Sequence, residues 1–204
     1  IADLAIRHDL IIVADEIYGR MIYAPNEHLS IATLQGMRER TITLNGFSKT
    51  YSMTGWRVGY LAAPAELVEM LVEPRHTLSI NTCTISQYAA LAALTGPQEP
   101  IDAMINEYAE RRAWLMPALT EAGFSYGHPG GAFYIYTNVS TAGLPSPLFC
   151  ERLLQETGVM LFPGTMFGDE SSDYIRISYL QPLPMIKEAM ERIASFTSSA
   201  RAAQ

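Results

Sequence analysis

The chain has 204 residues, of which 49% are hydrophobic and 17% charged, and this is the composition of a well-packed folded protein. Its net charge of -7 and pI near 5.1 argue against nucleic acid as a partner, and no segment approaches the roughly 20 uninterrupted apolar residues of a membrane span. Two cysteines and four scattered histidines form neither a disulfide framework nor a metal-ligand spacing, so we expect no metal and a reduced, cytoplasmic compartment.

The first predicted element is a helix over residues 1–7, in which Leu4 continues the apolar face that Ile1 begins. The chain opens at Ile1 rather than at a methionine, inside this helical pattern and without a signal peptide. We therefore expect an N-terminally truncated sequence that belongs to a longer protein.

Three strand patterns come next along the chain. Residues 10–14 form a continuous apolar run, which is typical of a parallel strand buried on both faces, and shorter strand patterns lie at 41–44 and 58–63. Helical spacing of apolar residues then predicts helices over 65–78, 84–95 and 101–122. Pro117 predicts a kink or break in the last helix near Met116.

The pattern changes after Gly123, where short β segments replace the long helix. These segments lie at 132–136, 159–162 and 174–178, with a helix over 146–157 and a closing helix from Pro184. We therefore predict an α/β fold with two parts, a larger α/β part over 1–104 and a smaller α+β domain over 105–204.

Polar motifs follow the first two strands directly. Asp15-Glu16-Ile17-Tyr18 comes after the buried run, and Asn45-Gly46-Phe47-Ser48-Lys49-Thr50 comes after strand 41–44. Open α/β sheets bind ligands at the carboxyl ends of their strands, so Asp15 and Lys49 are candidates for a site and for a nucleophile. Taken singly, Asp15 fits a solvated carboxylate at a helix start equally well, and Lys49 fits a surface lysine.

Two arginines stand in unusual surroundings. Arg57 follows Trp56 and lies between Gly55 and Gly59, where small neighbours allow an anion to approach a guanidinium, or where the arginine stacks on the tryptophan. Arg176 lies in the middle of an apolar strand, where a charge is costly unless it is paired or lies on a solvated sheet face. Strand alternation places Ile175 and Ile177 on the opposite face.

An ATPase is the competing interpretation, because residues 11–16 resemble a strand followed by an acid and Ser48-Lys49-Thr50 resembles the end of a phosphate-binding loop. That loop requires a glycine immediately before its lysine, and Ser48 occupies this position. We therefore reject the ATPase interpretation.

The Asp15–Tyr18, Asn45–Lys49 and Gly55–Gly59 motifs, together with the Arg176 strand, resemble class I/II aminotransferases of fold type I over nearly the whole chain. The resemblance implies the C-terminal part of such a fold, namely the end of a large pyridoxal-phosphate-binding domain and a small α+β domain. It also implies that Lys49 binds pyridoxal 5'-phosphate as a Schiff base and later shuttles a proton.

The resemblance assigns further roles around that cofactor. Asp15 would pair with the pyridine nitrogen, Tyr18 would donate a hydrogen bond to the ring oxygen, and Arg57 would bind the phosphate. Ser48 would add a hydroxyl to the phosphate, although many relatives have a serine three residues before the lysine, where this chain has Gly46.

The resemblance assigns substrate binding to Arg176, which would hold the α-carboxylate as a bidentate pair. The loop at 163–168 would shape the same pocket. The predicted function is transfer of an amino group between an α-amino acid and a 2-oxo acid, with no residue that identifies the amino acid.

Two alternatives stay open from the sequence. The same residues would serve a lyase or decarboxylase that uses this cofactor, and a third interpretation is the aminotransferase-like sensor half of a transcription regulator. The family is typically dimeric, so we expect a homodimer at full length. We also expect the 204 residues alone to bind cofactor poorly and to turn over little substrate.

Overall fold

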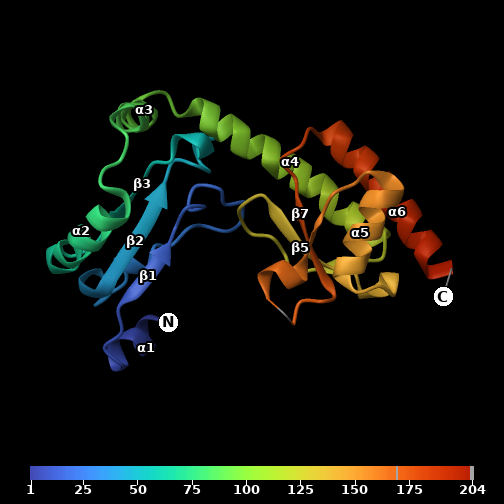
Figure 1. The fold of residues 1–204 in the computed structure, drawn as a ribbon, viewed down its shortest axis with the longest axis horizontal. Coiled ribbons are helices and arrows are strands. Elements are labelled where there is room, and N and C mark those ends of the chain that lie inside the picture. The colour runs from blue at the N-terminus through green and yellow to red at the C-terminus, as the bar shows by residue number, and fades with distance from the viewer. Residues whose placement is uncertain (169, 203–204) are drawn as a thin grey trace. The chain divides into compact units, whose positions relative to one another are not determined.

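The computed structural model describes residues 1–168 and 170–202, and it divides into two compact units, Ile1–Asp102 (unit 1) and Ala103–Gln204 (unit 2) (Figure 1). The boundary falls inside a long helix, α4 (Glu99–Glu121). The last two residues of the predicted small domain, 203–204, lie outside the described residues.

Unit 1 contains a three-stranded sheet with the order β1-β2-β3. Strands β1 and β2 are parallel, as predicted for the first strand, and β3 is antiparallel to β2. The helices and strands of this unit are α1 (Ala2–Arg7), β1 (Ile12–Asp15), β2 (Thr41–Gly46), β3 (Gly59–Ala62), α2 (Ala65–Ser79) and α3 (Thr84–Thr95). Three short 3-10 helices complete it: η1 (Ile31–Thr33), η2 (Arg38–Arg40) and η3 (Thr54–Trp56).

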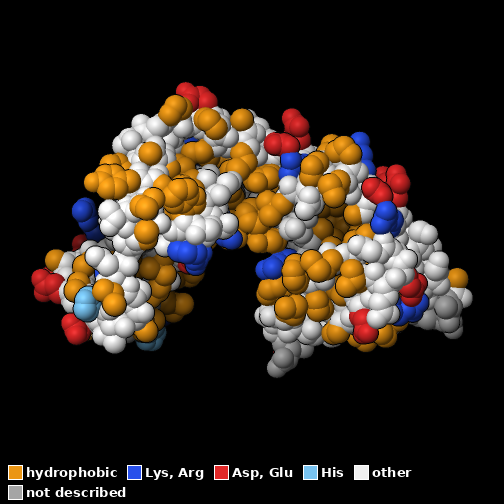
Figure 2. Space-filling view, turned by 45° about the horizontal axis from the view of Figure 1, so that its top comes forward, with side chains coloured by type: hydrophobic (Ala, Val, Ile, Leu, Met, Phe, Trp, Pro, Cys, Tyr) orange, Lys and Arg blue, Asp and Glu red, His pale blue; other side chains and the backbone are white. Residues whose placement is uncertain are grey.

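The prediction that the first strand is buried on both faces is wrong for this chain. Along β1, partly buried and exposed residues alternate, and Val13 is 63% exposed. One side of the strand is therefore partly covered, whereas the described residues leave the other side open. Figure 2 shows that hydrophobic side chains also gather on the surface of unit 1 in that view.

Unit 2 contains an antiparallel sheet with the order β4-β5-β7-β6. After α4 its elements are β4 (Ser125–Tyr126), β5 (Tyr134–Asn138), η4 (Ser140–Ala142), α5 (Ser146–Thr157), β6 (Phe162–Pro163), η5 (Gly164–Phe167), β7 (Tyr174–Ser178) and α6 (Leu183–Ala202). The predicted break in α4 is absent, because the helix continues through Pro117 to Glu121.

One face of the unit 2 sheet forms the core of this unit. Ile135 and Thr137 of β5, and Ile175 and Ile177 of β7, are all buried. Behind them the Phe149 ring of α5 contacts other aromatic rings edge-on, and each large side chain buried in this way contributes about 1.5–3 kcal/mol of stability. The strand pattern is confirmed, since the buried isoleucines lie on the face opposite Arg176.

Among the described helices, none is both long enough and apolar enough to cross a membrane. In the same part of the chain, no three His, Cys, Asp or Glu residues are grouped so that they could hold a metal ion.

Candidate active site

The topology of unit 1 brings three polar segments to one edge of its sheet. Because β1 and β2 are parallel, their carboxyl ends meet at the same edge, with Asp15 paired to Leu44. Because β3 is antiparallel, its first residue, Gly59, pairs with Gly46 at the end of β2. The segments that follow β1, follow β2 and precede β3 therefore lie together at this edge.

Asp15 ends β1 and is exposed at this edge. Its Oδ1 accepts a hydrogen bond from the backbone N–H of Ile17, at 3.1 Å, and this bond turns the chain immediately after the strand. The turn continues to Tyr18, which is half-buried and whose carbonyl accepts the N–H of Met21. The carboxylate therefore shapes the local backbone at the end of β1.

Glu16 is a residue whose role the sequence did not indicate. Its side chain is only 12% exposed, and both carboxylate oxygens are used: Oε2 lies 3.0 Å from His28 Nε2, and Oε1 accepts the Ser30 hydroxyl at 2.6 Å. These contacts tie the segment around residues 28–30 to the end of β1. The partners are more than ten residues away along the chain, so no local motif reveals them.

Lys49 lies in a tight turn that follows β2. The Phe47 carbonyl accepts the N–H groups of Tyr51 and Met53, each at 3.2 Å, and the Lys49 carbonyl accepts the Ser52 N–H at 3.2 Å. Phe47 and Met53 are buried, and both pack with Ala90 of α3 in one hydrophobic cluster. The half-buried Lys49 therefore lies in a turn that is stabilised by packing against the hydrophobic cluster of unit 1.

Ser48 precedes Lys49 in the same turn and is also half-buried. The glycine three residues before Lys49 has a packing reason. A β-carbon on Gly46 would lie 3.2 Å from the Gly59 Cα and 3.3 Å from the side chain of Ile17. A serine at position 46 would therefore require the neighbouring atoms of Gly59 and Ile17 to shift by a few tenths of an ångström.

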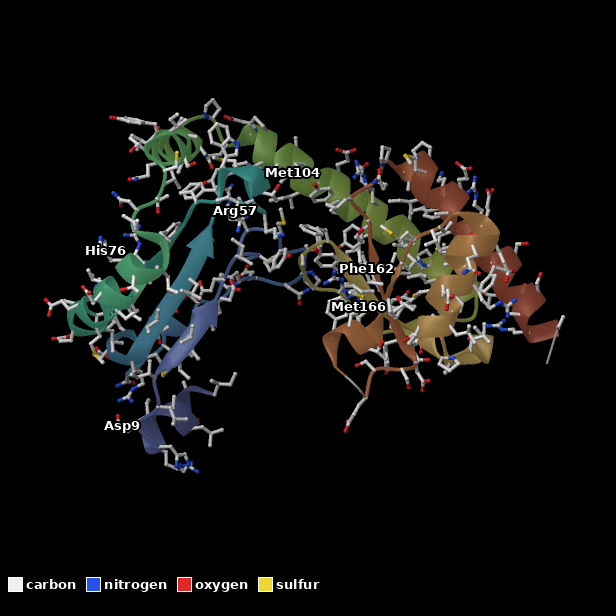
Figure 3. The ribbon with its side chains drawn as sticks, in the orientation of Figure 1. Asp9, Arg57, His76, Met104, Phe162 and Met166 are labelled. Atoms are coloured by element: carbon white, nitrogen blue, oxygen red, sulfur yellow. The ribbon has the colours of Figure 1, made fainter. Side chains whose placement is uncertain are left out.

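Arg57 follows η3 as its C-cap residue, close to the start of β3, and is exposed. Its Nη1 donates to the Thr54 carbonyl at 2.9 Å, and in the part of the chain that the structure describes no ring contact joins it to Trp56, which is 45% exposed. The stacking alternative is therefore not supported. Figure 3 shows Arg57 at the end of the unit 1 sheet opposite to Asp9.

Arg176 belongs to β7 in the antiparallel sheet of unit 2. Its guanidinium carbon lies 4.1 Å from the centre of the Phe167 ring, 4.5 Å from that of Tyr134 and 5.4 Å from that of Phe162. Its Nε is buried and has no hydrogen-bond partner among the described residues. Arg176 is therefore surrounded by rings instead of being paired with a carboxylate.

The loop at 163–168 forms one side of this surrounding. Its η5 helix carries Phe167, and Figure 3 shows the side chains of Phe162 and Met166 in the same part of unit 2. The sequence did not single out Tyr134, Phe162 and Phe167. Alternation of Tyr134 and Tyr136 with buried residues along β5 is the one signal that places aromatic rings on the face of Arg176.

Known proteins resemble this chain over nearly its whole length. A family model described as "Aminotransferase class I and II" matches residues 1–193. The chain is 43% identical over 195 residues to an aspartate aminotransferase of Pyrococcus abyssi, covering 95% of this chain and 50% of that protein. It is also 43% identical over 197 residues to aromatic-amino-acid aminotransferase 2 of Thermococcus litoralis, with the same two coverages.

A solved structure also resembles the fold of this chain. The aromatic aminotransferase of Pyrococcus horikoshii superposes with a TM-score of 0.93 at 42% identity, over 97% of this chain and 53% of that one. The chain thus spans about half the length of the curated relatives that it matches.

Proposed function

Because this chain belongs to the class I and II aminotransferase family, we propose that it supplies the lysine-bearing part of an enzyme that transfers an amino group between an α-amino acid and a 2-oxo acid. The predicted fold class is confirmed, since the chain has the mixed α/β fold of fold type I aminotransferases over about half of their length. The single observation that carries the proposal is the meeting of the Asp15, Lys49 and Arg57 segments at one sheet edge.

The residues at this edge fit pyridoxal 5'-phosphate chemically. The cofactor has a basic ring nitrogen, a phenolic oxygen, an aldehyde and a phosphate. The edge offers a carboxylate, a phenol, an amine and a guanidinium in Asp15, Tyr18, Lys49 and Arg57. Each cofactor group has a side chain of matching charge or hydrogen-bonding type. Bound pyridoxal phosphate supplies an aldehyde that takes up amino groups and a ring that accepts electron density.

Asp15 and Tyr18 would act on the cofactor ring. The exposed Asp15 carboxylate would accept a hydrogen bond from the protonated ring nitrogen and hold the proton there. Ile17 N–H already donates to Oδ1, and this bond fixes the direction of the carboxylate. The Tyr18 hydroxyl would donate to the ring oxygen.

Lys49 would link the cofactor to the chain through its Nζ. Once substrate has replaced that link, the neutral amine would move a proton at the α-carbon of the substrate. Arg57 would bind the phosphate through the N–H groups that the Thr54 carbonyl does not use, and the Ser48 hydroxyl would donate to the same phosphate. A rigid turn suits this task because proton transfer requires the amine at a fixed position.

Arg176 would bind the α-carboxylate, the group that all α-amino acids and 2-oxo acids share. The relatives are named as aspartate and aromatic-amino-acid aminotransferases, so their names agree on an amino-acid substrate and differ on its side chain. They favour transamination over the lyase and sensor alternatives. We therefore propose an α-amino acid without specifying its side chain.

The half-length match leads to a second part of the proposal. We propose that activity requires a subunit of the relatives' full length that contains this chain, here called the full-length subunit, acting as a homodimer. The division into the end of a large cofactor-binding domain over 1–104 and a small domain over 105–204 stays a prediction, as does a cytoplasmic location.

An amino-donor panel tests the proposal. The full-length subunit is incubated with pyridoxal phosphate, 2-oxoglutarate and each of the common amino acids, and glutamate formation is measured. We expect turnover with at least one donor, and its loss in Lys49→Ala. Lys187→Ala is the matched control, because Lys187 is the other lysine of the chain and is exposed on α6. Unchanged turnover in Lys49→Ala would refute the proposal.

A further inference from the structure

We propose that Tyr134, Phe162 and Phe167, the aromatic cage of unit 2, are positioning residues that hold the Arg176 guanidinium ready for the substrate carboxylate. Phe167 makes the closest contact, 4.1 Å from ring centre to guanidinium carbon. The inference deepens the proposed function and rests on it, because it presumes that Arg176 binds a carboxylate.

The cage is a consequence of strand register. Phe162 of β6 pairs directly with Arg176 of β7, and Tyr136 of β5 pairs with Arg176 from the other side. Tyr134 lies two residues from Tyr136 on the same face, at a diagonal position that a ring can span. Phe167 completes the cage from η5, outside the sheet.

The electrostatics of the cage leave the guanidinium available. Among the described residues, no ion pair and no hydrogen bond engages Arg176, and its buried Nε has lost water without gaining a partner. The negative faces of the rings stabilise the cation without using its N–H donors. A resident carboxylate would compete with the substrate, whereas a ring does not. An incoming carboxylate therefore meets a positive charge that is partly dehydrated and already oriented.

Phe167 is the cage residue best suited to a test. It is 48% exposed, so its replacement removes little of the hydrophobic core. Leu154 of α5 is 45% exposed and lies outside the loop at 163–168, which provides a matched control of similar exposure. A change specific to Phe167 therefore reports on the cage rather than on the loss of an exposed apolar side chain in general.

The test compares Phe167→Ala, Phe167→Leu and Phe167→Tyr in the full-length subunit loaded with pyridoxal phosphate. Leucine keeps apolar bulk without a ring, and tyrosine keeps the ring. We expect alanine and leucine each to raise KM for the amino donor about 3- to 30-fold, with kcat changed less than twofold. Phe167→Tyr and the control Leu154→Ala should leave both parameters within about twofold of the parent enzyme.

Two further measurements make each outcome decisive. In an Arg176→Ala background, Phe167→Ala should add no further increase in KM, because the cage acts only through the guanidinium. Calorimetric binding of glutarate, an unreactive dicarboxylate, should weaken in Phe167→Ala by a similar factor. Three results would each overturn the cage proposal. One is a KM for Phe167→Leu equal to that of the parent enzyme. The others are an additive effect of Phe167→Ala on KM in the Arg176→Ala background and unchanged binding of glutarate.

Failure of the cage and failure of the proposed function give different results. If the parent enzyme turns over no amino donor, the proposed function fails, and glutarate binding alone then decides on the cage. If the parent turns over a donor while the Phe167 variants match it, only the cage fails. Melting temperatures of all variants identify any that are misfolded.

Discussion

Arg57 combines a candidate ligand role with an unusual backbone. Its φ is 50°, in the left-handed region, where side chains other than glycine are uncommon. It is exposed, and its side chain donates one hydrogen bond, to Thr54. Removal of the guanidinium should therefore cost the folded chain little stability. The left-handed backbone conformation of Arg57 itself costs about 1 kcal/mol. A strained residue at the site edge fits a role in binding.

Replacing Arg57 separates these two properties. In the full-length subunit, Arg57→Ala and Arg57→Gly should weaken pyridoxal phosphate binding alike, by about 10- to 100-fold, because each removes charged hydrogen bonds to the phosphate. Glycine should leave the protein about 1 kcal/mol more stable than alanine, because it adopts positive φ freely. Absorbance titration measures the affinity and urea unfolding the stability.

Arg38→Ala is the control for this pair. Arg38 is an exposed arginine of η2, before the start of β2 and so at the opposite edge of the sheet. It should bind cofactor as the parent does. Equal loss of affinity in Arg38→Ala would mean that net charge, and not Arg57, determines binding.

The two cysteines offer a second test of local environment. Backbone hydrogen bonds at Ser86 and Ile85, in the first turn of α3, lower the pKa of the exposed Cys83 thiol. Burial raises the pKa of Cys150 to about 11. Because the thiolate is the reactive form, at pH 7.5 iodoacetamide should modify Cys83 rapidly and leave Cys150 intact until the chain unfolds. Peptide mass mapping measures this, and equal rates in the native state would contradict the packing around Cys150.

The elements that the sequence predicts best are those with a strong local pattern. The helix over 146–157 matches α5 at both ends, because Pro145 precedes it and Gly158, with φ of 72°, ends it. The long helix expected over 101–122 is correct in its extent and wrong only in its break, because α4 continues through Pro117 to Glu121. The strand expected over 159–162 is shorter and lies later, at Phe162–Pro163 in β6. The meeting of Asp15, Lys49 and Arg57 at one sheet edge follows from strand order. Alternation along β5 indicates rings on the face of Arg176, but no local pattern reveals the register of β6 or the position of η5, which complete the cage.

Gly164 tests the element that carries Phe167. A β-carbon there would lie 2.6 Å from the Tyr174 carbonyl oxygen and 2.6 Å from the Tyr136 hydroxyl. Gly164→Ala should therefore lower the free energy of unfolding by about 3 kcal/mol, since backbone must move to admit the methyl group. Gly127→Ala is the control, because a β-carbon at Gly127 meets nothing within 4 Å. Urea unfolding of both variants measures the difference, and equal stability would contradict the close packing of η5.

The two units differ in how much apolar surface they bury. In unit 1 every residue of β3 is exposed, α2 has no buried residue, and Leu78 is 86% exposed. In unit 2 the inner face of the sheet and one side of α6 are buried. Since burial contributes about 25 cal/mol per Å² of apolar area, unit 1 gains less stability within this chain. Contacts in a full-length subunit would supply the difference.

This asymmetry predicts how the 204 residues behave alone. Amides of β5 and β7 should exchange with solvent much more slowly than those of β1 and β3, because one face of β5 and β7 is buried in the core of unit 2. Cofactor binding should be weak, since the site edge belongs to the less stable unit. Hydrogen exchange and absorbance titration measure both. A full-strength cofactor absorbance band from the 204 residues, matching that of the full-length subunit, would contradict this expectation.

The central claim, that Lys49 carries the cofactor, is tested most directly by locating the bond. The full-length subunit is saturated with pyridoxal phosphate, reduced with borohydride so that the linkage becomes permanent, digested, and mapped by mass spectrometry. This chain contains two lysines, so Lys187 is an internal control within the same digest. We predict near-complete modification of Lys49 with Lys187 unmodified, and loss of the label in Lys49→Ala. An unmodified Lys49, or a label on Lys187 instead, would contradict the account.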